Sequence, residues 1–107
     1  MTGEDRVPMI SRQWRGLARG ERAADYEAHL RADTFPALLR LDGFVDGQIL
    51  RRALPQGVEF LVVTRWRSLA AIGAFAGRDL EAAVVPERVR AMMLEYDERA
   101  RHYEIVT

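Results

Sequence analysis

The chain has no cysteine, no lysine and no asparagine among its 107 residues. Without cysteine it can form no disulfide and no thiolate metal site, and it has no thiol nucleophile. No apolar run approaches the roughly 18 residues that are needed to cross a bilayer. The N-terminal residues also lack the character of a signal peptide. We therefore expect a cytoplasmic protein that does not enter a membrane.

An excess of charge of one sign is also missing, because 16 basic side chains balance 16 acidic ones. Proteins that bind nucleic acid usually carry a basic excess, so nucleic acid is not an expected partner. The sequence contains no His-x-x-x-His motif, no glycine-rich phosphate loop and no flavin fingerprint. We expect neither a bound metal nor a bound cofactor.

The segment from Val58 to Phe75 is the most informative part of the chain. It predicts a strand that leads into a helix, with Ser68 as the N-cap of that helix. Both faces of the strand are apolar: one carries Val58, Phe60, Val62, Thr64 and Trp66, and the other carries Leu61 and Val63 among charged residues. An antiparallel sheet usually leaves one face exposed to water, so a sheet with two apolar faces needs a second layer of protein packed against each face.

The other segments complete the order strand, helix, strand, strand, helix, strand. We predict a flexible arm over residues 1–8 and a single domain over residues 9–107. The predicted strands cover residues 9–15, 44–54, 58–67 and 101–107. The first predicted helix covers residues 21–33, and Thr34 and Pro36 should close it and begin a short extra turn through Leu38, Leu39 and Leu41. The other predicted helices are the segment from Leu69 to Gly77 and a final helix from Pro86, with Val89, Met92, Met93 and Tyr96 on its inner side. This order predicts an α+β, ferredoxin-like βαββαβ fold with a four-stranded antiparallel sheet.

The second apolar face of the sheet predicts a homodimer. Helices of the same chain can cover one face only, and monomers rarely expose a large apolar patch. Two sheets packed face to face would cover it, with an interface on the order of 2,000 Å².

Three short motifs resemble the antibiotic biosynthesis monooxygenase family, whose members are dimeric α/β barrels. These motifs are Trp66-Arg-Ser68, Phe75-Ala-Gly77 in the following helix, and the terminal segment from His102 to Val106. The resemblance covers roughly residues 9 to 106. It implies a homodimer and, for some members, oxygenation of aromatic compounds without a cofactor.

The sequence departs from the family pattern in two respects, and both bear on which activity the resemblance implies. Haem-degrading members place an axial histidine in the helical region after the Trp-x-Ser turn, but residues 69–95 contain no histidine. Those enzymes and several aromatic oxygenases also use a pocket asparagine, which this chain lacks. A cofactor-independent monooxygenase acting on an aromatic or conjugated small molecule is the leading hypothesis. A non-catalytic small-molecule-binding or accessory dimer, and a cyclase or isomerase on the same fold, are the alternatives.

His102 and His29 are the candidate catalytic residues, since only their unperturbed pKa suits proton transfer near neutral pH. His102 shares one side of its strand with Glu104. His29 follows Tyr26 by three residues, so both can face the same cleft. Each histidine could instead be structural or exposed.

The candidate substrate-binding residues are Trp66, Tyr26, Phe75 and Arg12. Trp66 could stack on a flat substrate and donate a hydrogen bond, or it could be core. Tyr26 and Phe75 would line the space between the helices and the sheet. Arg12 could bind a phenolate or carboxylate if it points inward, or pair with an acid of the partner if it lies at the dimer interface.

Overall fold

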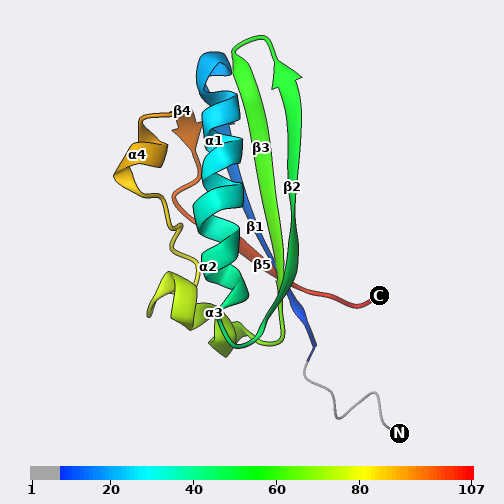
Figure 1. Ribbon diagram of the computed structural model, residues 1–107. Coiled ribbons are helices and arrows are strands. Elements are labelled where there is room, and N and C mark those ends of the chain that lie inside the picture. The colour runs from blue at the N-terminus through cyan, green and yellow to red at the C-terminus, as the bar shows by residue number, and fades with distance from the viewer. Residues whose placement is uncertain (1–7) are drawn as a thin grey trace, which may run out of the picture.

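The computed structural model describes residues 8–107 and places five antiparallel strands in one layer and the helices in a second layer (Figure 1). The expected N-terminal arm, apart from Pro8, lies outside the described residues. The strands are β1 (Ile10–Ala18), β2 (Phe44–Leu54), β3 (Gly57–Trp66), β4 (Met93–Tyr96) and β5 (Arg101–Glu104). Their order is β2-β3-β1-β4, and β5 also pairs with β1. The α+β, ferredoxin-like prediction is confirmed.

The fourth strand of the expected fold consists of two short strands here. Residues Gly16–Ala18 of β1 pair with β4, and residues Ile10–Gln13 pair with β5. β4 and β5 therefore follow one another along the same edge of β1, which gives five strands instead of four.

The predicted long final helix is wrong. Only α4 (Glu87–Arg90) is helical, and Met93 and Tyr96 belong to β4. Val89, Met92 and Met93 are nevertheless buried, as their apolar spacing predicted. A short run of apolar residues fits a helix face and a strand edge equally well, and pairing with β1 decides between them.

The first helix also extends further than expected. The chain is helical through η2 (Gly20–Arg22), α1 (Ala23–His29), the π-helix η3 (Leu30–Thr34) and α2 (Phe35–Leu39). Figure 1 shows these segments as one rod across the sheet. Pro36 was expected to end the helix, but the π turn places it in the first turn of α2. A proline is tolerated there because its missing N–H would have no helical partner.

β1 continues past Gly16 to Ala18, three residues beyond the predicted end of this strand at residue 15. A Cβ atom at Gly16 would lie 2.6 Å from the Trp14 ring, so this position needs glycine for close packing rather than for a turn. The helix after β3 agrees with its prediction: α3 (Leu69–Ala76) is capped by Ser68, which accepts a hydrogen bond from the Ala71 N–H, and Gly77 follows with a positive φ of 86°.

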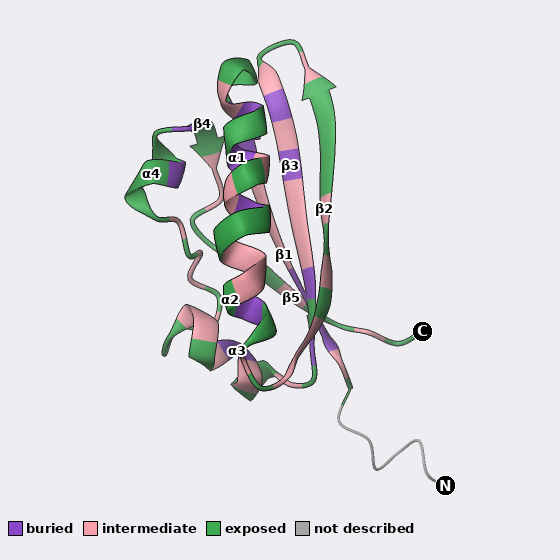
Figure 2. Cartoon of the chain, viewed as in Figure 1, coloured by how far each residue is buried: buried purple, intermediate pink, exposed green. Residues whose placement is uncertain are grey.

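The helices cover one face of the sheet, and the buried residues gather between the two layers (Figure 2). Arg12 and Trp14 of β1 lie opposite Thr64 and Val62 of β3 on this covered face. Two clusters fill the space: one lies around Phe60 and Tyr26, and the other contains Ile10, Leu38, Trp66 and Ile72.

The opposite face of the sheet has no cover from the described residues and is called the outward face below. Leu61 and Val63 of β3 are partly buried there, while Leu50 of β2 and Tyr103 of β5 are 44% and 49% exposed. Ion pairs surround these apolar side chains: Arg15 and Arg52 both bind Glu59, and Arg65 binds Asp46.

Candidate functional site

A cavity of about 230 Å³ lies between the sheet and the helical rod. Its floor is formed by Arg12, Trp14, Val62 and Thr64 of β1 and β3. The rod contributes Tyr26, His29, Leu30, Asp33, Thr34, Ala37 and Leu38. The remaining side is closed by Phe75 of α3, by Val84 and Pro86 of the connection after α3, and by Val89 of α4. The lining is largely apolar with a few polar groups, which is typical of small-molecule sites.

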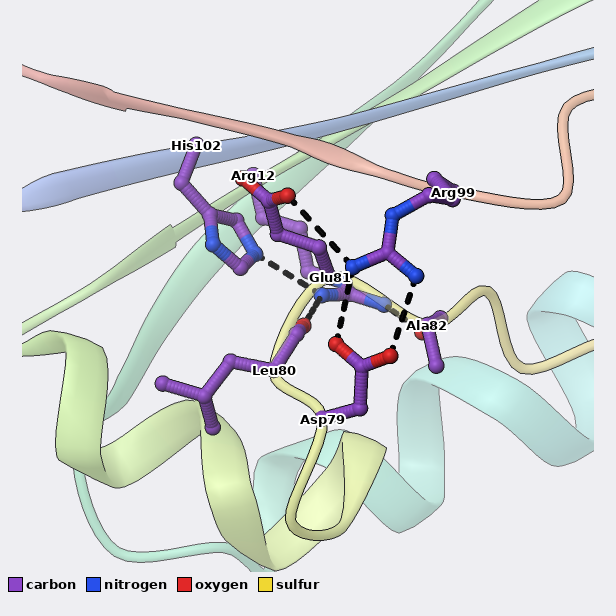
Figure 3. A network of polar contacts seen from close by, with 7 residues as sticks. All are labelled: Arg12, Asp79, Leu80, Glu81, Ala82, Arg99 and His102. Atoms are coloured by element: carbon purple, nitrogen blue, oxygen red, sulfur yellow. Dashed lines mark hydrogen bonds and ion pairs between the residues drawn. The ribbon is translucent and has the colours of Figure 1, made fainter.

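Arg12 lies on the covered face of the sheet, and its side chain reaches the connection that follows α3 (Figure 3). Its Nη1 donates to the Leu80 carbonyl and to His102, and its Nη2 donates to the Ala82 carbonyl at 2.8 Å. The residue is only 4% exposed. Of the two positions considered for Arg12, the inward one is therefore observed and the interface position is not.

The segment that Arg12 binds is also held to the link between β4 and β5. The Ala83 N–H donates to the Glu98 carbonyl, and the Ala100 N–H donates to the Glu81 carbonyl. Arg99 adds a bidentate ion pair with Asp79, with both distances 2.9 Å (Figure 3). This side of the cavity is thus fixed to the edge of the sheet.

His102 lies behind Arg12 and does not line the cavity. Its Nε2 is 2.8 Å from Arg12 Nη1, and because an arginine can only donate, Nε2 accepts and the imidazole is neutral. Burial lowers the pKa of His102, and the adjacent Arg12 lowers it further, while Glu81 acts in the opposite direction. Its position suits orientation of Arg12 rather than contact with a ligand.

His29 lines the cavity and has polar partners on both ring nitrogens. Its Nε2 is 3.2 Å from the Thr34 hydroxyl oxygen, and its Nδ1 is 2.7 Å from Arg88 Nη2 and 3.3 Å from Asp33 Oδ2. Burial lowers the pKa of His29, and Arg88 lowers it further. Because an arginine can only donate, Nδ1 accepts from Arg88, and the neutral ring carries its proton on Nε2, toward the Thr34 hydroxyl oxygen.

Tyr26 of the rod and Phe75 of α3 also line the cavity. The Tyr26 ring contacts Phe60 edge-to-face at 4.9 Å and stacks beside His29 at 6.4 Å. Burial raises the pKa of Tyr26, so its hydroxyl stays protonated and can donate a hydrogen bond. Phe75 lies 5.6 Å from the guanidinium carbon of Arg12, within the range of a cation–π contact.

Trp66 does not reach the cavity. It is fully buried, packs between Phe44 and Phe75, and donates its indole N–H to the Thr64 hydroxyl oxygen at 2.9 Å. It occupies the last position of β3, where α3 covers it. The substrate-stacking position expected for Trp66 differs from this placement, which agrees with the core alternative.

Three polar residues that line the cavity were not among the candidates: Asp33, Thr34 and Thr64. Neither was Arg88, which does not line the cavity but contacts His29. Asp33 follows His29 by four residues, a helical spacing that could have identified it. Thr34 follows His29 by five residues, and these two meet where the chain forms a π turn, which the sequence does not indicate. Arg88 reaches His29 from α4 across the chain, and no local pattern signals that contact.

The arrangement of strands and helices matches solved structures over nearly the whole chain. A protein described as an antibiotic biosynthesis monooxygenase from Bacillus cereus has 14% identity and a TM-score of 0.66, covering 94% of each chain. SnoaB, a cofactor-independent oxygenase from Streptomyces nogalater, has 15% identity and a TM-score of 0.68, covering 94% of this chain and 96% of its own. The chain has the fold of the antibiotic biosynthesis monooxygenases.

A third structure with this monooxygenase fold leads to the same assignment. It is a protein described as an antibiotic biosynthesis monooxygenase from Bordetella bronchiseptica, with 20% identity, a TM-score of 0.65, and coverage of 94% of this chain and all of its own. No protein-family model matches the sequence, and no curated protein does.

Two further classes of feature were sought in residues 8–107. No cluster of three or more His, Asp or Glu side chains in this part of the chain is arranged to hold a metal ion. Within the same residues, none of the helices has both the length and the apolar character of a membrane span.

Proposed function

We propose that the chain is a member of the antibiotic biosynthesis monooxygenase family that binds a conjugated small molecule in the cavity and oxygenates it without a cofactor. The observation that carries this proposal is the cavity itself, with a neutral histidine on its helical wall and a buried arginine on its floor. These are the two groups that a substrate anion needs: one to remove a proton and one to stabilise the negative charge that forms.

His29 is the proposed proton acceptor, because of the two histidines it alone lines the cavity. In the proposed reaction Arg88 moves away from Nδ1, so that Nδ1 can carry a proton and donate it to Asp33. Nε2, which contacts the Thr34 hydroxyl, then takes a proton from the substrate. Asp33 then orients His29 and stabilises the imidazolium, as an acid does behind a catalytic histidine. Asp33 is a positioning residue in this scheme.

The proposed reaction needs only substrate and molecular oxygen. Loss of a proton to His29 leaves a delocalised substrate anion, which transfers electrons to oxygen and forms a carbon–oxygen bond. Release of water then leaves a carbonyl, so that a CH₂ group and O₂ give C=O and H₂O. The apolar walls would keep bulk water away from the anion.

The other candidate residues take supporting roles in this proposal. Arg12 would pair with an oxygen of the substrate anion, while Tyr26 and Phe75 would provide aromatic contacts to its ring system. Trp66 acts through Thr64, which it contacts, and His102 acts through Arg12. Neither Trp66 nor His102 would touch the substrate.

The test uses 1,4-dihydroxynaphthalene as a probe, with ¹⁸O₂ as the oxidant. We expect one labelled oxygen atom in 2-hydroxy-1,4-naphthoquinone, formed together with water, whereas autoxidation gives unlabelled naphthoquinone and hydrogen peroxide. His29→Gln should reduce the labelled product by about 100-fold or more, since a general base contributes at least that factor. Arg40→Met, which removes an exposed charge after α2, should retain the wild-type rate. Absence of labelled product, or an unchanged rate in His29→Gln, would refute the proposal.

A non-catalytic binding or accessory role is the second candidate, and one contact favours it. Arg88 lies 2.7 Å from His29 Nδ1 and also binds Asp33, so it competes for the acid that would orient the base. A cyclase or isomerase would use the same base without oxygen. Ligand binding without labelled product would favour the binding role, and conversion of a probe under nitrogen would favour the isomerase.

We also propose a homodimer in which the outward faces of two sheets pack together. Leu50, Leu61, Val63 and Tyr103 provide its apolar contacts. The surrounding arginine–carboxylate pairs supply both signs of charge, so the face can be complementary to a second copy of itself.

A further inference from the structure

Arg12 is a buried cation without a carboxylate partner. Arg12 is only 4% exposed. None of its three hydrogen-bond acceptors carries a net charge: they are the Leu80 carbonyl, the Ala82 carbonyl and the neutral imidazole of His102. No acidic side chain in residues 8–107 forms an ion pair with Arg12. The negative charge of Glu81 acts on the pKa of Arg12, but Glu81 forms its ion pair with Arg99, at 3.5 Å. Buried charges in proteins are normally paired, so this one lacks a counter-ion.

Two N–H groups of the Arg12 guanidinium also have no hydrogen-bond acceptor in residues 8–107. A guanidinium has five N–H groups, and those three acceptors engage three of them. Within residues 8–107 the Nε–H and one N–H of Nη2 have no acceptor. Every polar side-chain atom there that solvent cannot reach has a hydrogen-bond partner, so the unpartnered Nε must be accessible, and the cavity that Arg12 lines provides the access.

Thr64 supplies a further donor beside Arg12. The two residues are register partners on β3 and β1, both are buried, and both line the cavity floor. The Thr64 oxygen already accepts the Trp66 indole N–H at 2.9 Å, which leaves the hydroxyl proton to be donated. The neighbouring floor residues Val62 and Trp14 offer no acceptor, since the Trp14 N–H donates to the Asp97 carbonyl.

From this geometry we infer that the cavity floor is a carboxylate site, and that the ligand is a small conjugated carboxylate that binds Arg12 and Thr64. Two carboxylate oxygens match the two remaining guanidinium N–H groups, the pairing in which arginine is strongest. Drug-sized ligands occupy cavities of about 300–1,000 Å³. A cavity of about 230 Å³ therefore suits one or two fused rings rather than a larger ring system. This inference deepens the proposed function and depends on the same cavity.

Binding of 2-naphthoate and of its neutral isostere 2-naphthamide, measured by titration calorimetry without turnover, tests the inference. We expect the wild-type protein to bind naphthoate about tenfold or more tightly than naphthamide, because a hydrogen-bonded charge is worth at least that factor. Arg12→Met should abolish this preference. The matched control Arg40→Met removes the same charge from an exposed site and should retain it.

A second measurement depends on the wild-type protein alone, so it decides the matter even if Arg12→Met does not fold. The Nε–H resonance of Arg12 in ¹H–¹⁵N spectra should shift when naphthoate saturates the protein and stay unchanged with naphthamide. Equal affinity for the two probes, wild-type naphthoate affinity in Arg12→Met, or an unmoved Arg12 resonance would each overturn the inference.

The test separates this inference from the proposed function. His29→Gln should still prefer naphthoate, because His29 lies on the helical wall and not on the floor. Naphthoate binding without any oxygenation of the diol probe would overturn the oxygenase alone. Formation of the labelled product by a protein that binds naphthoate and naphthamide equally well would overturn the carboxylate site alone.

Discussion

Arg12 connects three parts of the molecule through one guanidinium group. It belongs to β1, binds the connection after α3 through two carbonyls, and contacts His102 of β5. The same group lines the cavity, so the structure that holds the cavity closed also presents a positive charge to its interior. A ligand anion that binds Arg12 would therefore bind a side chain that hydrogen bonds already hold in place.

Trp66 contributes to stability rather than to ligand contact. Trp66→Phe removes the indole N–H bond to Thr64 and leaves a small void in a fully buried position. We expect the free energy of unfolding to fall by about 1–3 kcal/mol, measured by urea denaturation. Leu39→Ala, at a 70% exposed site on the helical layer, should change it by less than about 0.5 kcal/mol. A fully stable Trp66→Phe variant would contradict this assignment.

The two histidines predict a loss of stability in mild acid. Burial, with Arg88 beside His29 and Arg12 beside His102, lowers the pKa of both below the ordinary value of 6.5. Asp33 and Glu81 face the same histidines, and the lowered pKa is the net result. The unfolded chain then binds more protons than the folded one as the pH falls through 6.5, so folding becomes less favourable.

Urea denaturation between pH 7.5 and pH 5.5 checks this sign. The free energy of unfolding should decrease toward pH 5.5, and His29→Gln combined with His102→Gln should flatten the decrease. Stability that increases toward acid pH would show that the histidines are charged in the folded protein.

At the residue scale the sequence identified Arg12, His29, Tyr26 and Phe75, all of which line the cavity. It could do so because strand alternation and helical spacing determine which side chains share a face. Asp33 was within reach of the same reasoning. Thr64 was too, because strand alternation places it on the same face as Trp66, two residues away. Arg88 was not, because it contacts His29 from a distant part of the chain.

Among the elements, the helical rod is the one that shapes the cavity. Its π turn, Leu30–Thr34, contains the segment that carries Asp33 and Thr34 beside His29. π turns are rare and occur frequently at functional sites. The π turn also accommodates Pro36 in the first turn of α2. The same turn therefore lets the helical rod continue and brings Asp33 and Thr34 beside His29.

The cap of α3 gives a prediction for a single element. Ser68→Ala removes the acceptor for the Ala71 N–H, whereas Ser68→Asp keeps an acceptor and adds negative charge at the helix N-terminus. We expect Ser68→Ala to lower the free energy of unfolding by about 1 kcal/mol and Ser68→Asp to leave it nearly unchanged. Thermal denaturation of both variants measures the difference, and equal losses would show that the cap does not stabilise α3.

β2, β3 and α3 were predictable because Pro55 and Gly57 mark the turn between the two strands and Ser68 caps the helix. The segment from Val89 to Tyr96 was not, because four apolar residues fit a helix as well as a bend into β4. The deciding interaction is long-range: β4 pairs with residues 16–18, at the other end of the chain.

At the scale of the whole molecule, the helices cover one face of the sheet (Figure 2), and the outward face carries exposed apolar side chains together with arginine–carboxylate ion pairs. The proposed dimer covers that outward face. Sedimentation equilibrium should give twice the chain mass of 12.2 kDa.

Leu61→Glu should weaken the proposed dimer about 100-fold or more, because it would bury an unpaired charge at the interface. The matched control is Leu39→Glu, which makes the same change at a 70% exposed site on the helical layer and should leave the dimer intact. A wild-type protein of single-chain mass at high concentration would refute the assembly.

The central claim is that the space between the sheet and the helical rod is a ligand site. A crystal structure of the protein soaked with 2-naphthoate tests it most directly. We predict ligand density in the cavity, with the carboxylate within hydrogen-bond distance of Arg12 and Thr64 and the rings between Tyr26 and Phe75. A cavity filled by the protein's own side chains, or naphthoate bound only elsewhere on the molecule, would contradict the account.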